Sequence, residues 1–491
     1  MSEHPADEFF DVCIVGAGIA GLNAAFVASQ YLPPDATILI LDKHDQPGGM
    51  WNDAYSYVRL HQPYQIFTAG NIKWTLGREP GYLASRDEVV EHLRHCFDEI
   101  ASRVSLEARW GWTYDSFEET SSGVAVAAAD PGGQSHRIRA DRLINAIGFD
   151  IEVSQALRFS ASNVRSISPQ QVAEVGLLTA ADDAPAWVVG SGKTAMDTIN
   201  AMVAGNPGRE IGMITGAGTY FINRDKIYVS GVRRWLGGAR PNSVFAETAN
   251  RFDGSNGASV GDWFRTTFGV TPIPDAPHNF FGALSMAESA NVLTATRHVV
   301  RDHLVDIVDE DGVPALALRS GDRRAIAAGS WIVNCTGHFT PRVVDHDPYV
   351  SAGGRALSIN SSSMTLGFSS FSAYYLSHLF FLGKLSTAPL YELDFHAARK
   401  LAAADAPAVL SALIIHNLSV VFENVPQKVF QNCGLDFDLW YPAPRRLAGQ
   451  LKFLRTHKRD RERHRQTLDA YATRTGVRCA QLEVPPITVA S

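Results

Sequence analysis

The stretch "DVCIVGAGIAGLNAAFVASQ", residues 11–30, decides the fold of this chain. An apolar strand is expected at 12–15, and Gly16, Gly18 and Gly21 follow it at the spacing Gly-x-Gly-x-x-Gly before an alanine-rich helix. In this pattern the first glycine makes the turn, the second lets backbone approach a pyrophosphate, and the third lets helix and strand pack closely. The amides at the helix N-terminus, around Ala20, face the phosphate charge. The stretch predicts a dinucleotide-binding loop in a Rossmann-like α/β fold.

The next apolar segment supports this interpretation. "ATILILDKHD", residues 36–45, reads as a second buried strand that ends in Asp42 and is followed by Lys43. Asp42 comes 21 residues after Gly21, at the position where an acidic side chain accepts hydrogen bonds from ribose hydroxyls. A glycine-rich turn in an ordinary α/β protein is the alternative, but it does not account for the complete strand–loop–helix–strand series.

A second loop lies in "AWVVGSGKTAMDTI", residues 186–199, where "GSGKT" suggests a phosphate loop for ATP or GTP. That motif needs a glycine five positions before Gly192, and the residue there is Trp187, which is too large for a backbone cradle. The dinucleotide pattern fits instead, with a strand before the loop and a helix after it. The predicted cofactor-binding residues of this loop are Gly190, Ser191, Gly192, Lys193, Thr194 and Ala195.

Composition excludes several classes of protein. The chain has 491 residues, is 45% hydrophobic and 19% charged, and carries a net charge of -7, which gives no reason to expect nucleic acid. We expect a cytoplasmic protein without a signal peptide or a membrane span. The five cysteines are scattered and form no Cys-x-x-Cys pair, so neither a dithiol centre nor a metal site is predicted.

The two loops belong to two similar modules. Each is followed, after a similar length of chain, by an apolar strand that ends in a glycine turn, "LINAIGFD" at 143–150 and "WIVNCTGHF" at 331–339. We expect the chain to cross between domains at these turns, although two unrelated strands ending in glycine are the alternative. The predicted division is a discontinuous first domain at 1–155 and 330–390, a second domain inserted into it at 156–329, and a mainly helical C-terminal cap at 391–491.

The block "DKHDQPGGMWNDAYSYVRLHQPYQ", residues 42–65, together with the two loops, resembles the class B flavin-containing monooxygenase superfamily over roughly residues 9–390. The resemblance implies that the first loop holds FAD and the second holds NADPH. It also implies that Gly49, Met50 and Trp51 lie along FAD. Trp51 as an ordinary core residue is an alternative.

The same resemblance implies the residues near the reaction. His61 and Gln62, in "RLHQP", approach the flavin ring, and Asn71 is a third polar candidate. A hydrogen-bonded structural histidine fits His61 equally well, because one histidine carries no chemistry by itself. "HLFFLGKL", residues 378–385, resembles a late strand that returns backbone to the flavin and places Gly383 beside it.

The chain departs from the family before the second loop. Many members carry Phe-x-Gly-x-x-x-His-x-x-x-aromatic there, whereas "FSASNVRSISP" keeps Phe159 but has Ala161, Arg165 and Pro169 at the other positions. This weakens a Baeyer–Villiger interpretation. The strand "EIGMIT" ends without an acidic residue that could hold a ribose 2′-hydroxyl, and the nearest cations are Arg224 and Lys226. NADPH is therefore favoured, and NADH remains open.

The resemblance implies a monooxygenase that uses NAD(P)H and O2 through a C4a-peroxyflavin to oxygenate a small organic substrate, more readily at nitrogen or sulfur. Three alternatives stay open: a Baeyer–Villiger enzyme, an FAD-dependent oxidoreductase without oxygenation, and a non-catalytic regulatory flavoprotein. A homodimer is also left open. We further expect the polar stretch 246–263 to form an excursion over the surface or the active site, and the basic stretch 445–465 to be a solvated helix face.

Overall fold

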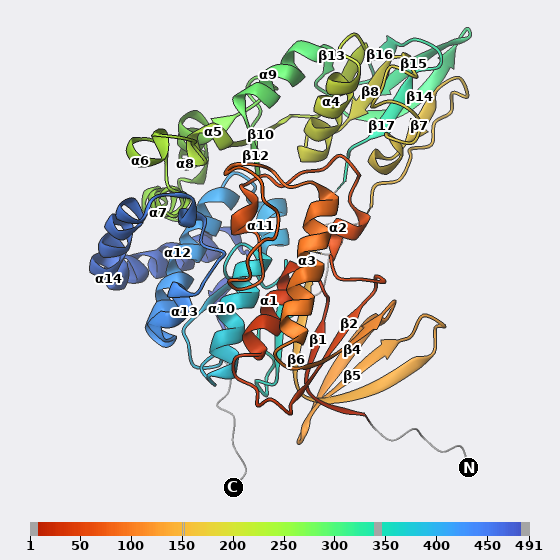
Figure 1. Ribbon diagram of the computed structural model, residues 1–491. Coiled ribbons are helices and arrows are strands. Elements are labelled where there is room, and N and C mark those ends of the chain that lie inside the picture. Colours follow the sequence, from red (N-terminus) through yellow and green to blue (C-terminus); the bar gives the residue numbers. More distant parts are fainter. Residues whose placement is uncertain (1–7, 150, 152, 338–345, 483–491) are drawn as a thin grey trace.

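The computed structural model describes residues 8–149, 151, 153–337 and 346–482. Its larger sheet has seven strands, and the N-terminal strand lies near its middle (Figure 1). β1 pairs in parallel with β2 and β6, β2 pairs in parallel with β3, and β18 pairs in parallel with β6. β4 and β5 extend the sheet as antiparallel strands. The bounds are β1 (Phe9–Val15), β2 (Thr37–Asp42), β3 (Ser105–Trp110), β4 (Thr113–Thr120), β5 (Gly123–Ala129), β6 (Ser135–Gly148) and β18 (Ala356–Asn360).

Three helices, α1 (Ile19–Ala28), α3 (Arg86–Ala101) and α10 (Ser369–Phe381), pack with this sheet around one apolar core. α1 is buried almost throughout because α3 and α10 both pack against it. α3 has a different pattern, with one apolar face and a capping box formed by Ser85 and Glu88 at its start. These helices hold the first glycine loop rigidly at the carboxyl edge of the sheet.

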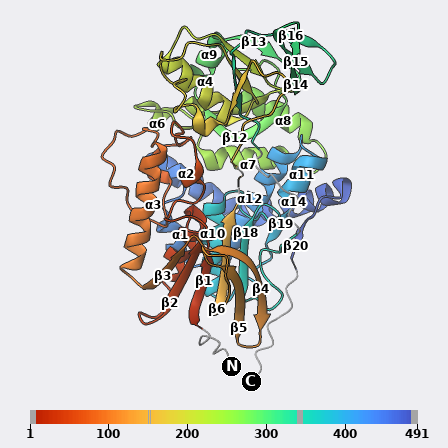
Figure 2. The same cartoon turned by 90° about the vertical axis from the view of Figure 1, so that its right-hand side faces the viewer.

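A second, all-parallel sheet lies at the other end of the molecule, in the order β13-β9-β8-β17-β7 (Figures 1 and 2). α4 (Lys193–Gly205) and α9 (Met286–Ala295) pack against one another beside it. The strands are β7 (Arg165–Ile167), β8 (Ala186–Val189), β9 (Ile211–Ile214), β13 (Thr296–Val300) and β17 (Trp331–Asn334). Since β18 of the first sheet follows this whole unit in sequence, the predicted α/β fold with one Rossmann-like domain inserted in another is confirmed.

One predicted boundary is wrong. The sequence pattern assigns the strand Trp331–Asn334 to the returning part of the first domain, with a start at 330. In the structure this strand pairs with β8 and β7 of the second sheet. An apolar strand buried on both faces fits either sheet, so its sequence does not say which one it joins. The chain leaves the first sheet after Gly148, as expected, and leaves the second only after Asn334.

Two small sheets flank the second domain. They contain β10 (Thr219–Asn223), β11 (Gly269–Val270) and β12 (His278–Leu284) in one, and β14 (Leu304–Glu310), β15 (Val313–Leu318) and β16 (Arg323–Ala325) in the other. The stretch 246–263, predicted as an excursion over the surface or the active site, lies mostly in two helices, α7 (Pro241–Arg251) and α8 (Gly257–Phe268). Its polar residues cover the outer faces of helices whose inner faces are buried, including Val244 and Phe264. Two short helices, α5 (Arg224–Ile227) and α6 (Arg233–Leu236), precede them.

The C-terminal region is mainly helical, as predicted, and it packs beside both domains (Figure 2). Its elements are β19 (Tyr391–Leu393), α11 (Phe395–Leu401), α12 (Ala406–Asn424), α13 (Gln427–Gln431), α14 (Ala443–Thr475) and β20 (Cys479–Gln481). Among the described helices, α12 has the length and hydropathy of a membrane span. However, 78% of its apolar window is buried inside the fold, which is the pattern of a core helix. α14 carries the basic stretch on a largely exposed face.

Candidate functional site

The first glycine loop is shaped by contacts that leave no room for side chains. Gly16 has φ +98, and a Cβ there would lie 2.8 Å from the Ala146 carbonyl oxygen. A Cβ on Gly21 would lie 1.7 Å from the Gly16 carbonyl oxygen, so the third glycine permits the close packing of helix and loop. The Cα of Gly49 lies 3.3 Å from an added Gly18 Cβ. The loop and the "GGMW" turn therefore approach each other with bare backbone, as a dinucleotide cradle requires.

Asp42 fixes this loop from the end of β2. Its Oδ2 accepts a hydrogen bond from the Ala17 amide at 2.5 Å, and its Oδ1 accepts one from the His44 amide at 2.8 Å. The His44 imidazole lies between two carboxylates, with Nδ1 2.9 Å from Asp42 Oδ1 and Nε2 2.8 Å from Asp53 Oδ2. The hydrogen bond to Asp42, followed by the bond to Asp53, raises the pKa of His44 to about 9. The sequence analysis did not identify His44.

This histidine gives the first domain a predictable pH dependence. Its folded pKa of about 9 lies above the unfolded value of about 6.5, so its stabilising contribution is complete below pH 6.5 and is lost as the pH rises through 9. The contribution is at most about 3 kcal/mol. We expect the thermal unfolding midpoint to fall between pH 7 and pH 10, and the fall to be smaller in His44→Gln. Equal falls in both proteins, measured by differential scanning fluorimetry, would contradict this role.

The second glycine loop has the same construction. Gly190 has φ +125, and a Cβ there would lie 2.4 Å from the Cys335 carbonyl oxygen. A Cβ on Gly192, the N-cap residue of α4, would instead meet no described atom within 4 Å. Ala195, at the position of the third glycine, is fully buried. The backbone at Gly192 is therefore open toward the space where a pyrophosphate would lie.

Lys193 of the "GSGKT" motif is tied to its own helix. Its ammonium forms an ion pair with Asp197, and the Tyr55 hydroxyl donates a hydrogen bond to the other Asp197 oxygen at 2.8 Å. Tyr57 lies 2.8 Å from the Thr198 hydroxyl, one residue further along α4. Two tyrosines that follow the "GGMW" turn thus dock on the first turns of α4. A phosphate-loop lysine reaches the phosphates, whereas this one is held by a carboxylate.

Both loops open into one cleft of about 1310 Å³ between the two domains. The first domain contributes Gly16, Gly18, Ala20, Asp42, Lys43, Gly49, Met50 and Trp51 to its lining, and the second contributes Gly190, Ser191, Gly192, Lys193 and Thr194. Gly21 and Ala195 lie behind the lining, where they pack helix against strand. Trp51 is partly buried against the first core and also faces the cleft.

His61 and Gln62 lie in the cleft lining. Burial lowers the pKa of His61 well below its ordinary value, and the positive charges of Lys193 and Arg224 lower it further. His61 is therefore a neutral imidazole at pH 7. The side chains of both residues have no hydrogen-bond partner among the described parts of the chain, so they are available to a ligand.

Arg224, the predicted cation of the second domain, lies near His61 rather than at the end of β9. One of its terminal nitrogens donates to Glu288 at 2.5 Å, and the other is buried without a partner among the described residues. Arg319 and His303 occupy the place at the end of β9 instead, in the lining beside Thr215 and Gly216. His303 comes from the β13–β14 connection and Arg319 follows the end of β15, 88 and 104 residues after Thr215, so no local motif could have identified them.

The structure places two predicted site residues outside the described lining of the cleft. "HLFFLGKL" is not a strand, because His378–Phe381 belong to α10 and Gly383 follows the end of that helix. An apolar run buried on all sides does not distinguish a helix from a strand. Asn71 is exposed and lies beside Gly434, because Gly70, with φ +55, turns the chain away. The described residues that line the cleft include neither Gly383 nor Asn71.

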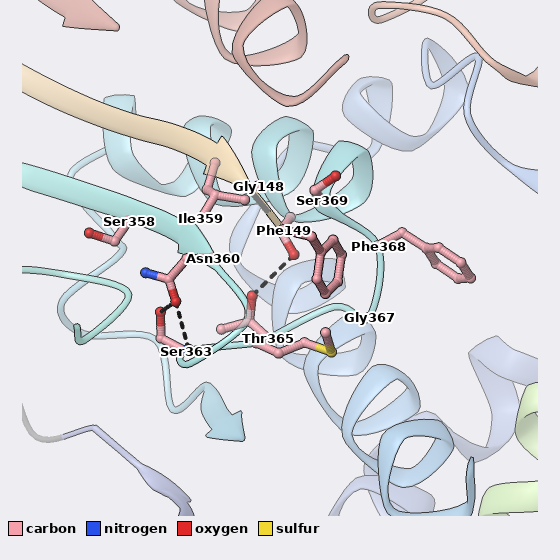
Figure 3. Close-up of a pocket in the computed structure, with 12 residues that line it drawn as sticks. Gly148, Phe149, Ser358, Ile359, Asn360, Ser363, Thr365, Gly367, Phe368 and Ser369 are labelled. Atoms are coloured by element: carbon pink, nitrogen blue, oxygen red, sulfur yellow. Dashed lines mark hydrogen bonds between the residues drawn. The ribbon is translucent and has the colours of Figure 1, made fainter. Parts of the chain in front are cut away.

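The N-terminal end of α10 reaches the cleft, whereas Gly383 follows the C-terminal end of this helix. Phe368, Ser369, Ser370 and Phe371, at its N-terminus, are lining residues that the sequence analysis missed. The ends of β6 and β18 converge close to Phe368 and Ser369 (Figure 3). At the end of β18, Asn360 Oδ1 accepts hydrogen bonds from the amides of 362 and 363 at 2.8 and 3.0 Å. The helix thus directs the positive end of its dipole at the cleft.

Comparisons with known proteins agree with the first domain. The family described as "NAD(P)-binding Rossmann-like domain" matches residues 14–76. A Mycobacterium tuberculosis protein named as FAD-containing monooxygenase MymA is 26% identical over 214 residues, which are 41% of this chain and 41% of that protein. One component of the opine oxidase of Rhizobium meliloti is 28% identical over 142 residues, 29% of this chain and 23% of that one. The chain thus aligns with less than half the length of these relatives.

Solved structures with a similar arrangement include a flavin-containing monooxygenase from Stenotrophomonas maltophilia, at 13% identity and a TM-score of 0.47 over 77% of this chain and 99% of that one. Another is an open crystal structure of cyclohexanone monooxygenase, at 12% identity and a TM-score of 0.49 over 82% and 97%. Residues 14–76 match an NAD(P)-binding Rossmann-like domain, and over part of its length the chain is similar to a protein named as an FAD-containing monooxygenase.

Proposed function

We propose that the protein is an NADPH-dependent flavin monooxygenase that holds FAD at the first loop and NADPH at the second, and that oxygenates a small organic substrate at nitrogen or sulfur. The observation that carries the proposal is that both glycine loops open into one cleft. Two dinucleotides bound there extend toward each other, because each pyrophosphate is fixed at a helix N-terminus on its own side. All five cysteines are free and buried, which supports a reducing compartment such as the cytoplasm.

The first loop fits FAD by its own geometry. The first helical hydrogen bond of α1 runs from the Leu22 amide to the Gly18 carbonyl, so the amides before Leu22 lack helical acceptors and are available to a pyrophosphate. Gly18 and Gly49 keep the approach to them open. Asp42 retains acceptor capacity for a ribose, because a carboxylate has about four lone-pair sites. The α10 N-terminus faces the same cleft and favours negative charge there.

When bound, FAD supplies the hydride acceptor and the reaction with O2. The residues of the chain position the partners and control protons. Neutral His61 offers one donor and one acceptor, and Gln62 offers an amide, with both facing the space between the loops. Aromatic side chains from α7, α10 and α11, such as Phe245, Phe368 and Phe395, exclude water from the adjoining part of the cleft.

Arg319 is proposed to bind the 2′-phosphate of NADPH. Its guanidinium is exposed at the cleft without a partner among the described residues, and His303 lies next to it. Asp302 also lines this part, but its oxygens accept bonds from the amides of His303 and Ser320 at 2.7 and 3.0 Å. A hydrogen bond to a charged group contributes about 1.5–3 kcal/mol.

We therefore expect Arg319→Gln to raise the KM for NADPH by about 10- to 100-fold and to leave the KM for NADH within about two-fold. Steady-state kinetics with both nucleotides measures this difference. Arg323→Gln is the matched control, because Arg323 is exposed on β16 and lies outside the cleft lining. If NADPH and NADH are affected equally, Arg319 does not select the phosphate.

The test of the proposed function has two steps. NADPH must first bleach the bound flavin without air, since a regulatory flavoprotein would not be reduced. Turnover under ¹⁸O₂ with amines, thioethers and cyclic ketones, analysed by mass spectrometry, then identifies the product. Label in an N- or S-oxide supports the proposal. Label in a lactone would assign Baeyer–Villiger chemistry, and oxidation of NADPH to peroxide alone with every substrate would assign an oxidoreductase without oxygenation.

A further inference from the structure

One part of the cleft is built differently from the two dinucleotide loops. It is enclosed by α7, α10, α11, α12 and the turn Phe437–Trp440, and its walls are mostly aromatic or aliphatic. Phe368 stands at its centre, in edge-to-face contact with Phe245 at 6.1 Å and with Phe437 at 5.3 Å between ring centroids. We call this part the aromatic chamber, and its main residues are Phe245, Phe368, Phe371, Phe395, Leu410 and Phe437.

These residues form one continuous surface although they come from distant segments. Phe245 and Phe395 belong to the same apolar cluster as Leu410. Gly367, just before Phe368, faces Leu410, because a Cβ on Gly367 would lie 3.5 Å from a Leu410 methyl carbon. α7 packs closely on α12, and α11 also packs on α12 (Figure 2). The chamber therefore suits an apolar group of a ligand.

Arg399 is the one cation among the described residues of this chamber, and it is exposed at the cleft. It lies one helical turn after Phe395 on α11, and both line the cleft. Among the described residues, its guanidinium has no hydrogen bond or ion pair. Desolvation by the surrounding protein lowers the pKa of Arg399 from its ordinary value, but an arginine remains charged at neutral pH.

The acidic groups near Arg399 in sequence already have other partners. The Asp405 carboxylate forms an ion pair with Arg474. Asp394 caps α11 by accepting a hydrogen bond from the Ala397 amide at 2.9 Å. Glu392 lies 3.1 Å from His346 Nε2. The other described carboxylates of the cleft, Asp42, Asp53 and Asp302, lie at the dinucleotide ends. Within the described part of the chain, no carboxylate therefore compensates the charge of Arg399 in the chamber.

We propose that the aromatic chamber binds substrates that combine an apolar body with an anionic group, and that Arg399 pairs with that group. The proposal rests on the proposed function and specifies its substrate class as organic acids. A guanidinium offers a planar fork of donors that matches a carboxylate, and such charge-assisted bonds are stronger in a site with apolar walls. An amine substrate without an acidic group would place a second positive charge beside Arg399, which is unfavourable.

The experiment compares three probes that differ only in one end: 3-(phenylthio)propanoate, its primary amide, and 3-(phenylthio)propan-1-amine. Isothermal titration calorimetry with the FAD-loaded protein measures their affinities without turnover. We expect the carboxylate to bind at least about ten-fold more tightly than the amide, and the amine to bind most weakly. The preference should fall as salt is raised, because Arg399 is open to the cleft.

The variant Arg399→Gln should reduce the preference for carboxylate over amide to about two-fold or less. Lys400→Gln is the matched control: it removes the same charge from the next residue, which lies outside the cleft lining, and it should keep the parent preference. Equal binding of carboxylate and amide by the parent, or an unchanged preference in Arg399→Gln, would overturn the proposal. Both results are read from binding, so they are separate from a failure of NADPH to reduce the flavin, which would overturn the proposed function.

Discussion

The Gly18→Val variant will purify without FAD and without NADPH oxidation activity. A valine Cβ at this position lies only 3.3 Å from the Gly49 Cα, and its methyl groups extend into the space that a pyrophosphate needs. The loss of two backbone hydrogen bonds to a charged phosphate, at about 1.5–3 kcal/mol each, weakens binding by about 3–6 kcal/mol. This corresponds to a decrease in affinity of about 100-fold to 10,000-fold. The absorbance ratio of flavin to protein after purification measures how much FAD the variant retains.

The control for this variant is Gly77→Val. Gly77 lies in the same domain, has no left-handed backbone conformation, and would place a Cβ with no described atom within 4 Å. It should therefore retain the parent content of FAD. Circular dichroism and the unfolding midpoint show whether Gly18→Val is folded. A folded Gly18→Val protein with the parent flavin content would show that the first loop is not the FAD site.

The Gly192→Val variant will keep its FAD and lose reduction by NADPH. The added side chain meets no described atom within 4 Å, so the second domain should fold normally. The same side chain projects from the N-cap of α4 into the cleft, where the nicotinamide dinucleotide is expected. We expect the anaerobic rate of flavin reduction at a fixed, subsaturating NADPH concentration to fall at least about 100-fold, for the same reason as at Gly18. Stopped-flow absorbance measures this rate.

Binding of ATP–Mg²⁺ provides the second arm of this test. Lys193 is held by Asp197, and Trp187 stands where a phosphate loop has its first glycine, so we expect no tight ATP binding to the parent. Calorimetry with ATP–Mg²⁺ and with NADPH distinguishes the two ligands. Tight ATP binding that disappears in Lys193→Ala would contradict the assignment, as would parent-like flavin reduction by NADPH in Gly192→Val.

The sequence by itself determined the parts of the protein that depend on neighbours along the chain. Gly16, Gly18 and Gly21 lie in the tight strand–turn–helix that the spacing predicts, because a side chain at each of these positions would crowd nearby backbone. The same holds for the second loop, where Gly190 and Gly192 follow a strand of four apolar residues. The block from Asp42 to Gln62 also supplies many residues to the cleft lining, since it continues directly from β2.

Only the tertiary structure decided the features that join distant segments. An apolar run is buried equally well in a helix or a strand, so packing of α10 against α1 determined that Phe368, and not Gly383, faces the cleft. The strand Trp331–Asn334 joined the second sheet through pairing that its own residues do not encode. Arg319 and Arg399 reach the cleft because long-range packing brings their elements there. Nothing in the sequence around an isolated arginine indicates which residues will surround it in the folded protein. The steric requirements of a turn depend on residues that are neighbours in the sequence, so the sequence alone predicts them. The residues that line a cleft between domains depend on contacts between segments hundreds of residues apart, so only the tertiary structure determines them.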